Sequence, residues 1–261
     1  MIVAPAASHL GAANRVVIVA DKHLYALNFE TLIVPAPRPH YWIEDATITT
    51  ASSIDLLASA NRAAPNRGSM LLIGDPTPED RTLPPLPWAR TEMQRVRAHF
   101  ADATVIAGPR ATADAYLDTV TRRYGFVHFV AHGIGNTTRP LDSAIVLGNK
   151  LYAREILKHR LNARLVTISS CHGAGQRAFA GEGLVGLAWA FLRAGAHQVV
   201  AALWEVSDSA TPQLMDAMYG AIERGEDPAA ALREAKLALL RSNTVYRRPL
   251  YWAPFVLYAG A

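Results

Sequence analysis

The stretch from Leu165 to Gly175, LVTISSCHGAG, constrains the fold more than any other part of the chain. It begins with apolar and β-branched residues, and small hydroxyl residues, the only cysteine and two glycines follow. A short apolar run that ends in this way is typical of a buried parallel strand followed by a tight loop. In open α/β sheets, ligands bind at the carboxyl ends of the strands. The pattern therefore places Cys171 where a reactive group could act, although a lone cysteine is more often a small core residue.

A second apolar run ends at His132, which is followed by Gly-Ile-Gly. A cysteine nucleophile needs a nearby base to increase its thiolate fraction, and histidine is the usual one. His128 lies four residues earlier on the same predicted strand, roughly 13 Å away, so we expect it to be a buried core histidine with a hydrogen-bond partner. His172 follows Cys171 directly, and adjacent side chains of an extended chain point to opposite sides. His172 is therefore a weaker candidate for the base than His132.

Strand-like and helix-like segments alternate from residue 70 onward, which predicts an α/β fold. The expected architecture is a three-layer α/β/α sandwich with a mostly parallel central sheet and helices on both faces. The predicted strands are 70–76, 103–108, 126–132, 165–171, 198–204 and 255–258, and the predicted helices are 89–100, 111–123, 184–193, 210–223 and 228–241.

The first part of the chain has a different pattern. Residues 15–20 and 24–28 are short β-like pieces separated by a polar turn, which predicts a hairpin. Prolines at 35, 37 and 39 interrupt the pattern, and residues 51–60 suggest a short helix. The loop at 63–68 is the best internal boundary. We therefore predict a small β-rich N-terminal part at 1–67 and a main core at 68–261.

Composition excludes several classes of protein. Hydrophobic residues make up 51% and charged residues 18% of the 261 residues, so the chain can bury a sizeable core. The net charge of +4 is small, and the basic runs are more simply explained as solvated surface, so we expect no direct nucleic-acid binding. One cysteine excludes an internal disulfide, and we find no His/Asp/Glu cluster with metal-ligand spacing, so no metal or cofactor is expected. No apolar run reaches membrane-spanning length and no convincing signal peptide precedes the first strand, so a cytoplasmic protein without a membrane segment is expected.

The two strand ends resemble the His and Cys motifs of CHAT domains, which belong with caspases, separases, legumains and gingipains. The resemblance rests on FVAHG at 129–133 and ISSCHGAG at 168–175. It continues through GEGL at 181–184, AFLRAGA at 190–196, LWEVSD at 203–208 and YWAPFVL at 251–257. It is clear over residues 68–261 and looser over the first 60. One departure is His172, which stands where the family usually has an acidic residue.

This resemblance implies a caspase-like fold and a cysteine endopeptidase with a Cys171–His132 dyad. The backbone amides of Gly133 and Cys171 would hold the oxyanion. Gly133 could equally belong to an ordinary turn at the end of the strand. The family pattern also implies a role in bacterial signalling.

The segment after the predicted strand 198–204 is expected to border the substrate site, with Trp204 as one contact. In separases, an aspartate in the matching motif receives a basic side chain at P1, and Asp208 matches that aspartate. Alternatively, Asp208 or Ser209 caps the helix that begins near residue 210. The two roles are not exclusive.

The resemblance also implies protein partners, because CHAT domains commonly sit beside helical repeats or partner subunits that control them. The expected function is thus cleavage of a partner protein, with basic residues as candidate P1 residues. Regulation would come from a partner or from sequence outside this chain. The alternative is a non-catalytic signalling or interaction module on the same scaffold, since a fold does not fix its function. A serine α/β hydrolase is disfavoured because the G-x-S-x-G elbow is absent from the sequence.

Overall fold

The computed structural model describes residues 3, 10, 14–20, 24, 27–51, 54, 57, 68–120, 124–136, 138–171 and 180–259, with only the backbone at 171 and 180–185. The strands are β1 Arg15–Val19, β2 Ile33–Val34, β3 His40–Tyr41, β4 Thr47–Ala51, β5 Ser69–Pro76, β6 Asp102–Gly108, β7 Phe126–Ile134, β8 Ala144–Val146, β9 Lys150–Tyr152, β10 Leu165–Cys171, β11 Gln198–Ala202 and β12 Phe255–Ala259. The helices are α3 Ala89–Ala98, α4 Ala113–Val120, α5 Ala153–Ile156, α6 Ala180–Ala194, α7 Thr211–Glu223, α8 Pro228–Leu240 and α9 Pro249–Trp252, with short 3-10 turns at η3 Phe29–Thr31, η4 Trp42–Glu44, η5 Pro140–Asp142 and η6 Val245–Arg247.

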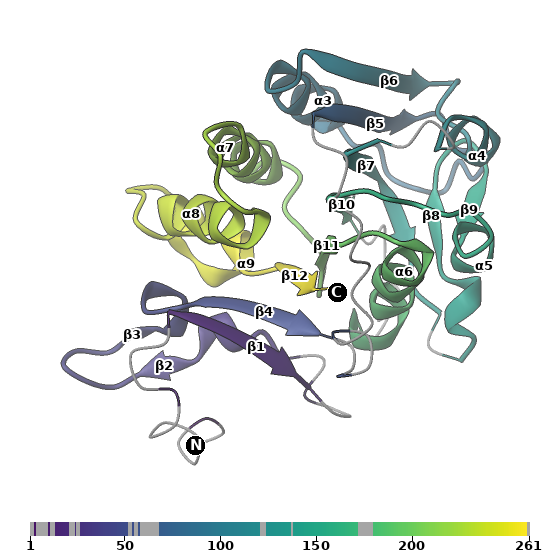
Figure 1. Cartoon of the computed structure of the whole chain (residues 1–261). Coiled ribbons are helices and arrows are strands. Elements are labelled where there is room, and N and C mark those ends of the chain that lie inside the picture. Colours follow the sequence, from purple (N-terminus) through teal and green to yellow (C-terminus); the bar gives the residue numbers. More distant parts are fainter. Residues whose placement is uncertain are drawn as a thin grey trace.

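A ten-stranded sheet forms the centre of the molecule (Figure 1). Its main path has the order β1-β4-β12-β11-β10-β7-β5-β6, and the hairpin β8–β9 joins it at β7. All pairs along this path are parallel except β11–β12, and β8 is antiparallel to β7. The prediction of a mostly parallel central sheet is therefore confirmed. Strands that are buried on both faces need nearly continuous apolar sequence, and β7 is buried from Phe126 through Gly133.

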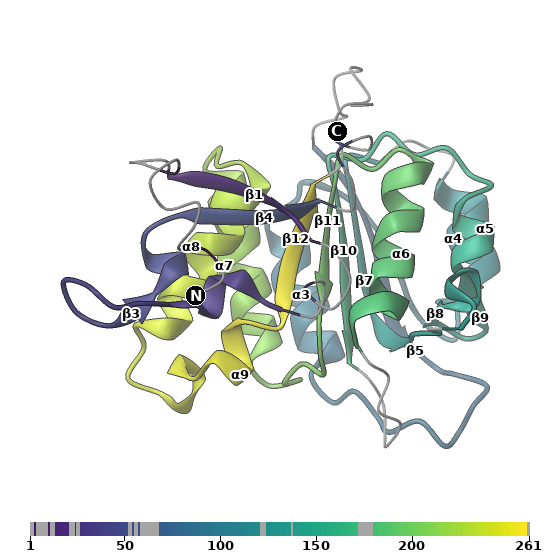
Figure 2. The same cartoon turned by 90° about the horizontal axis from the view of Figure 1, so that it is seen from below.

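Helices cover both faces of this sheet, as Figure 2 shows. α4, α5 and α6 pack on one face, and α3, α7 and α8 pack on the other. The two-residue period of a strand divides each strand between two cores. In β5, Leu71 and Ile73 contribute to the first core, whereas Met70 and Leu72 contribute to the second. The predicted three-layer arrangement is thus confirmed.

Local sequence signals set several helix boundaries. The Thr112 hydroxyl accepts a hydrogen bond from the Ala115 amide at the start of α4, and Asp227 accepts from Ala229 and Ala230 at the start of α8. Gly195 ends α6 with a φ of +115°, and a Cβ there would lie 2.2 Å from the Leu161 carbonyl oxygen. Only glycine fits this position.

The predicted hairpin at 15–28 is wrong. β1 pairs in parallel with β4, and β4 joins the main sheet through Tyr258 of β12. Part of the second β-like piece lies outside the described residues, and η3 begins directly after it, where the Asn28 side chain accepts a hydrogen bond from the Glu30 amide at 2.8 Å. The helix expected at 51–60 and the loop expected at 63–68 lie almost wholly outside the described residues. The boundary near residue 67 stays a prediction.

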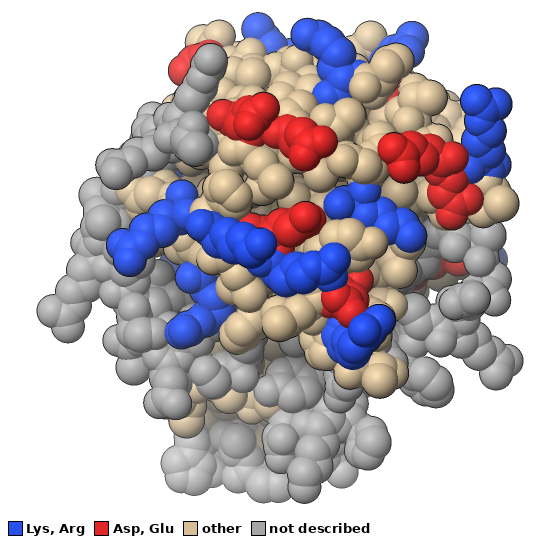
Figure 3. Space-filling model, turned by 90° about the vertical axis from the view of Figure 1, so that its right-hand side faces the viewer, with Lys and Arg blue, Asp and Glu red and all other residues tan. Residues whose placement is uncertain are grey.

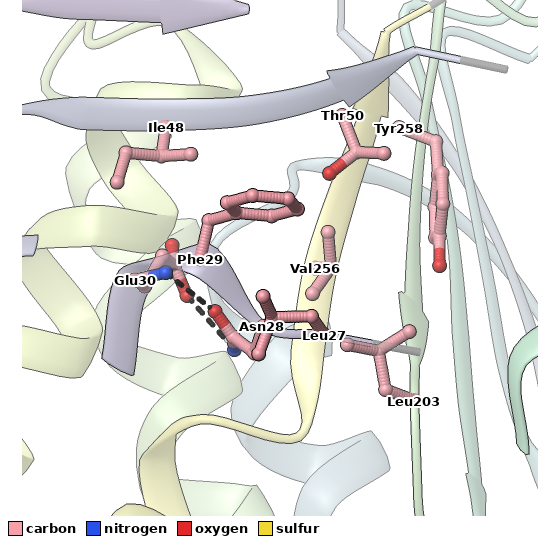
Figure 4. A pocket seen from close by; sticks show the side chains of 9 residues that line it. All are labelled: Leu27, Asn28, Phe29, Glu30, Ile48, Thr50, Leu203, Val256 and Tyr258. Carbon is pink, nitrogen blue, oxygen red and sulfur yellow. Dashed lines mark hydrogen bonds between the residues drawn. The ribbon is translucent and has the colours of Figure 1, made fainter. Parts of the chain in front are cut away.

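A buried ion pair fastens the N-terminal segment to the rest of the molecule. Lys236 of α8 is fully buried and pairs with Glu30 of η3, and it also donates to the Phe255 carbonyl of β12. The Asn28 amide donates to Glu30 and to the Ala253 carbonyl. Asn28 and Glu30 line a cavity whose volume of about 10 Å³ is room for about one water molecule. Figure 4 shows their side chains beside the other lining residues. The lining residues are Leu27, Asn28, Phe29, Glu30, Ile48, Thr50, Leu203, Val256 and Tyr258.

Charges of both signs share the surface on the side where α4, α5 and β9 lie (Figure 3). In this part of the chain, Arg139 and Arg154 both form salt bridges with Asp142. Arg154 also lies over the ring of Tyr152, 3.9 Å from its centroid. Within the part of the chain that the structure describes, no helix is both long and apolar enough to span a membrane.

Candidate active site

The two predicted catalytic residues lie opposite each other on neighbouring strands. β7 and β10 are parallel, and their register runs from Phe126 paired with Leu165 to His132 paired with Cys171. Neighbouring strands lie about 4.8 Å apart, and residues paired in register share one face of the sheet. The backbone thus brings residues 132 and 171 together at the carboxyl ends of two central strands. The Cys171 side chain lies outside the described part of the chain, so the dyad itself stays a prediction.

A backbone carbonyl holds the His132 ring. His132 is 3% exposed, and its Nε2 lies 2.8 Å from the carbonyl oxygen of Pro84. A carbonyl oxygen only accepts hydrogen bonds, so Nε2 carries the proton. In the neutral ring, the lone pair is then on Nδ1. The sequence analysis did not identify Pro84, which lies in the proline-rich segment between β5 and α3.

His128 is a core histidine, as predicted. It is fully buried, with Nε2 2.9 Å from Glu92 Oε1 and Nδ1 3.0 Å from the Tyr219 hydroxyl. The Tyr219 hydroxyl lies 2.8 Å from Thr167 Oγ1. This hydrogen-bonded chain joins α3, β7, α7 and β10 beneath the site. His128 therefore helps to hold these four elements together beneath His132. His172 lies outside the described residues.

The Asp208 side chain is hydrogen-bonded to the backbone at the start of α3. Its Oδ2 accepts a hydrogen bond from the Trp88 amide at 3.0 Å. Burial raises the pKa of the Asp208 carboxyl, the Trp88 amide lowers it, Glu92 raises it and His132 lowers it. Burial is the largest of these effects, so the pKa of Asp208 lies above its usual range.

The alternative role of Asp208 or Ser209 as a helix cap is wrong. α7 begins at Thr211 after Ala210, and none of the described side chains caps it. The Ser207 carbonyl accepts from the Ala210 and Thr211 amides instead. The Asp208 side chain is directed to a different helix, which no local sequence signal reveals.

The other predicted site residues lie at the same edge of the sheet. Gly133 is inside β7, paired with Ile145 of β8, so it does not belong to a turn at the strand end. Trp204 lies two residues beyond β11, is partly buried and packs against both cores. The oxyanion role of Gly133 and the substrate contact of Trp204 stay predictions.

A cleft of about 860 Å³ opens beside His132. Binding sites for small ligands usually measure about 300–1,000 Å³. The segment from Asp75 to Pro87 forms most of its wall, with Pro and Leu side chains and the charged residues Asp75, Glu79, Asp80 and Arg81. Among the described residues, no group of three or more His, Cys, Asp or Glu side chains could hold a metal ion.

A helix-covered parallel sheet with histidine and cysteine positions paired at its carboxyl edge defines a caspase-like fold. The structure resembles separase in the Saccharomyces cerevisiae separase–securin complex, with a TM-score of 0.54 and 15% identity over 84% of this chain and 14% of that chain. It also resembles the Arg-specific cysteine proteinase gingipain R, with a TM-score of 0.56 and 9% identity over 83% of this chain and 54% of that chain. The family model of the CHAT domain matches residues 1–260, and the chain belongs to this family.

Curated relatives of the chain are much longer proteins. A region of 107 residues, 41% of this chain, is 38% identical to tetratricopeptide repeat protein 28 of Mus musculus and 33% identical to that of Homo sapiens. The match spans only 4% of the length of either protein.

Proposed function

We propose that this CHAT domain is a cysteine endopeptidase in which Cys171 is the nucleophile and His132 the base. The register that pairs residues 132 and 171 is the observation that supports this proposal most directly. A thiol with a pKa of about 8.5 is only a few per cent ionised at neutral pH, and a neighbouring imidazole increases the thiolate fraction. Because the Pro84 carbonyl occupies Nε2, the Nδ1 atom would take the thiol proton.

The reaction then follows the usual course of acyl transfer. The Cys171 sulfur adds to the scissile carbonyl, and the oxyanion accepts hydrogen bonds from the amides of Gly133 and Cys171. One such donor lowers the barrier by roughly 3–4 kcal/mol. The imidazolium of His132 gives its proton to the leaving amine, and water hydrolyses the thioester.

The substrate in this proposal is a protein segment that lies along the carboxyl edge of the sheet. The cleft beside His132 receives one part of it, and Trp204 contacts another. Cleavage would follow a basic residue, whose charge pairs with Asp208. The Arg-specific activity named for gingipain R, which has the same fold, supports this choice of P1.

Control of the activity would come from a protein partner or from a helical-repeat segment outside this chain. The similarity to tetratricopeptide repeat protein 28 and the fold shared with separase, seen in complex with securin, support this part of the proposal. The similarity to tetratricopeptide repeat protein 28 also favours the second candidate function, a non-catalytic interaction module.

Incubation with a peptide library at pH 7 tests the peptidase proposal. Cys171→Ala and His132→Ala should each reduce cleavage by about a thousandfold or more, because the nucleophile and its base act as a unit. His159→Gln, in the stretch between α5 and the amino end of β10, is the matched control and should cleave like the wild type. Cleavage that persists in Cys171→Ala would contradict the proposal. An inert wild type whose Cys171 reacts like an ordinary thiol would favour the interaction module.

A further inference from the structure

The segment from Pro84 to Trp88 is held by hydrogen bonds at both ends. At its first residue, the Pro84 carbonyl accepts from His132 Nε2 at 2.8 Å. At its last residue, the Trp88 amide donates to Asp208 Oδ2 at 3.0 Å. The segment therefore connects a residue that follows β11 with the ring of the proposed catalytic base.

The composition of this segment restricts its backbone. Three of its five residues are Pro84, Pro85 and Pro87, and each proline ring fixes φ near −65°. The Ala89 amide donates to the Leu86 carbonyl at 3.1 Å, which folds the segment directly into α3. Fewer backbone dihedral angles are therefore free between the Trp88 amide and the Pro84 carbonyl than in an ordinary segment of this length.

We propose that Asp208 is a positioning residue for His132, acting through the Trp88 amide and the Pro84 carbonyl. The carboxylate holds the amide, the proline-rich segment holds the carbonyl, and the carbonyl keeps the His132 proton on Nε2. This inference deepens the proposed function and rests on it, since it requires that His132 serves Cys171.

The chemistry of the contact suits this role. A hydrogen bond from an amide to a carboxylate is shorter and stronger than one between neutral groups. Trp88 also precedes α3, and the partial positive charge at the start of a helix attracts a carboxylate. Without Asp208, the segment loses its second anchor, and the His132 ring can rotate or exchange its tautomer. The thiolate fraction of Cys171 should then fall.

Alkylation of Cys171 measures this effect without any peptide substrate. Cys171 is the only cysteine of the chain, so the mass of the intact protein reports its reaction with iodoacetamide. Asp208→Ala should slow alkylation at pH 7 by about tenfold and move the pH profile toward that of a free thiol, whose pKa is about 8.5. Asp208→Asn retains an acceptor oxygen for the Trp88 amide, so it should rescue the rate to within about threefold of the wild type.

Two further variants make the experiment decisive. Trp88→Pro removes the same hydrogen bond from the donor side, at a residue whose side chain is exposed, and it should behave like Asp208→Ala. Trp88→Pro also tests the positioning role if Asp208→Ala does not fold. Glu205→Gln removes an exposed carboxylate from the stretch that follows β11, three residues before Asp208, and should alkylate like the wild type.

The outcomes separate this inference from the proposed function. Wild-type alkylation in both Asp208→Ala and Trp88→Pro, with a changed profile in His132→Ala, would overturn the positioning role alone. A loss in Asp208→Asn as large as in Asp208→Ala would also overturn it, because an acceptor oxygen retained for the Trp88 amide would then have no effect on Cys171. A profile that does not change in His132→Ala would overturn the dyad and the positioning role together.

Discussion

Tyr116 and Tyr219 are fully buried on opposite sides of the central sheet. Burial raises the pKa of both hydroxyls. The Tyr219 hydroxyl lies within hydrogen-bond distance of Thr167 and His128, whereas that of Tyr116 has no partner among the described residues. A buried hydroxyl without a partner loses its bonds to water and gains nothing in return.

The same substitution should therefore act oppositely at the two positions. Tyr116→Phe should leave the free energy of unfolding unchanged or raise it by up to about 1 kcal/mol. Tyr219→Phe should lower it by about 1–3 kcal/mol, because it removes the partner of two buried groups. Urea denaturation measures both values. Equal losses in the two variants would contradict this account of Tyr116.

At the scale of single residues, the sequence identifies the reactive side chains of the site better than it identifies the backbone groups that they bind. His132 and Cys171 are recognisable because their residue types, and their positions at the ends of apolar runs, can be read directly from the sequence. The Pro84 carbonyl is not, because every residue carries a carbonyl and only the folded backbone selects one. The partner of Asp208 is equally hidden, since Trp88 lies 120 residues away.

Among the elements, those governed by local signals are predictable. α3, α7 and α8 lie within a few residues of their predicted bounds, because periodicity and caps act over one or two turns. β4 was missed, since Thr47–Ala51 is rich in threonine and lacks a clear apolar run. The hairpin prediction failed because β1 pairs with a strand about thirty residues away. The alternation of apolar and polar residues does not show which strand is the partner.

The contact between α3 and α7 includes a histidine that should make stability depend on pH. His99, at the end of α3, has Nε2 2.8 Å from Asp216 and Nδ1 2.8 Å from Glu223, both on α7. Burial lowers the pKa of His99, but the hydrogen bonds to Glu223 and Asp216 outweigh burial, so the pKa is raised above 6.5. A cation at the end of a helix is also favoured by the helix dipole.

His99→Gln should therefore destabilise the protein more at low pH than at high pH. A raised pKa in the folded state gives stability that is fully present below about pH 6.5 and lost as pH rises through the folded pKa. We expect a difference of about 0.5–1 kcal/mol from the wild type at pH 5.5–6 that shrinks by pH 8.5, measured by urea denaturation. In an Asp216→Asn/Glu223→Gln background, the effect should lose its pH dependence. A difference that stays constant with pH would contradict the ion pair.

On the scale of the whole molecule, one buried cation joins three distant segments. Lys236 of α8 contacts Glu30 of η3 and the Phe255 carbonyl of β12. Burial lowers the pKa of the Lys236 amine, and Glu30 opposes this effect. Removing one partner leaves an uncompensated charge at this depth, which is costly, whereas replacing both partners by apolar residues often is not.

Variants of Lys236 and Glu30 should accordingly show strong coupling. Lys236→Met and Glu30→Leu should each lower the free energy of unfolding by about 3–5 kcal/mol, because each leaves a buried charge without its partner. The double variant should be less destabilised than the sum of the two, and denaturation of all four proteins measures the difference. Additive losses would show that the two charges do not depend on each other.

The place of β12 in the sheet has a consequence for the synthesis of the chain. β12 lies between β4 and β11, so the early strands cannot join the sheet until residues 255–259 have been made. At 5–20 residues per second, the ribosome needs about 10–40 s to cover the roughly two hundred residues between β4 and β12. Throughout that time, β1 and β4 can pair only with each other, and the edge of β4 is open to strands of neighbouring chains. A chain that is terminated before residue 255 would lack the strand that joins β4 to β11, and its sheet would be divided in two.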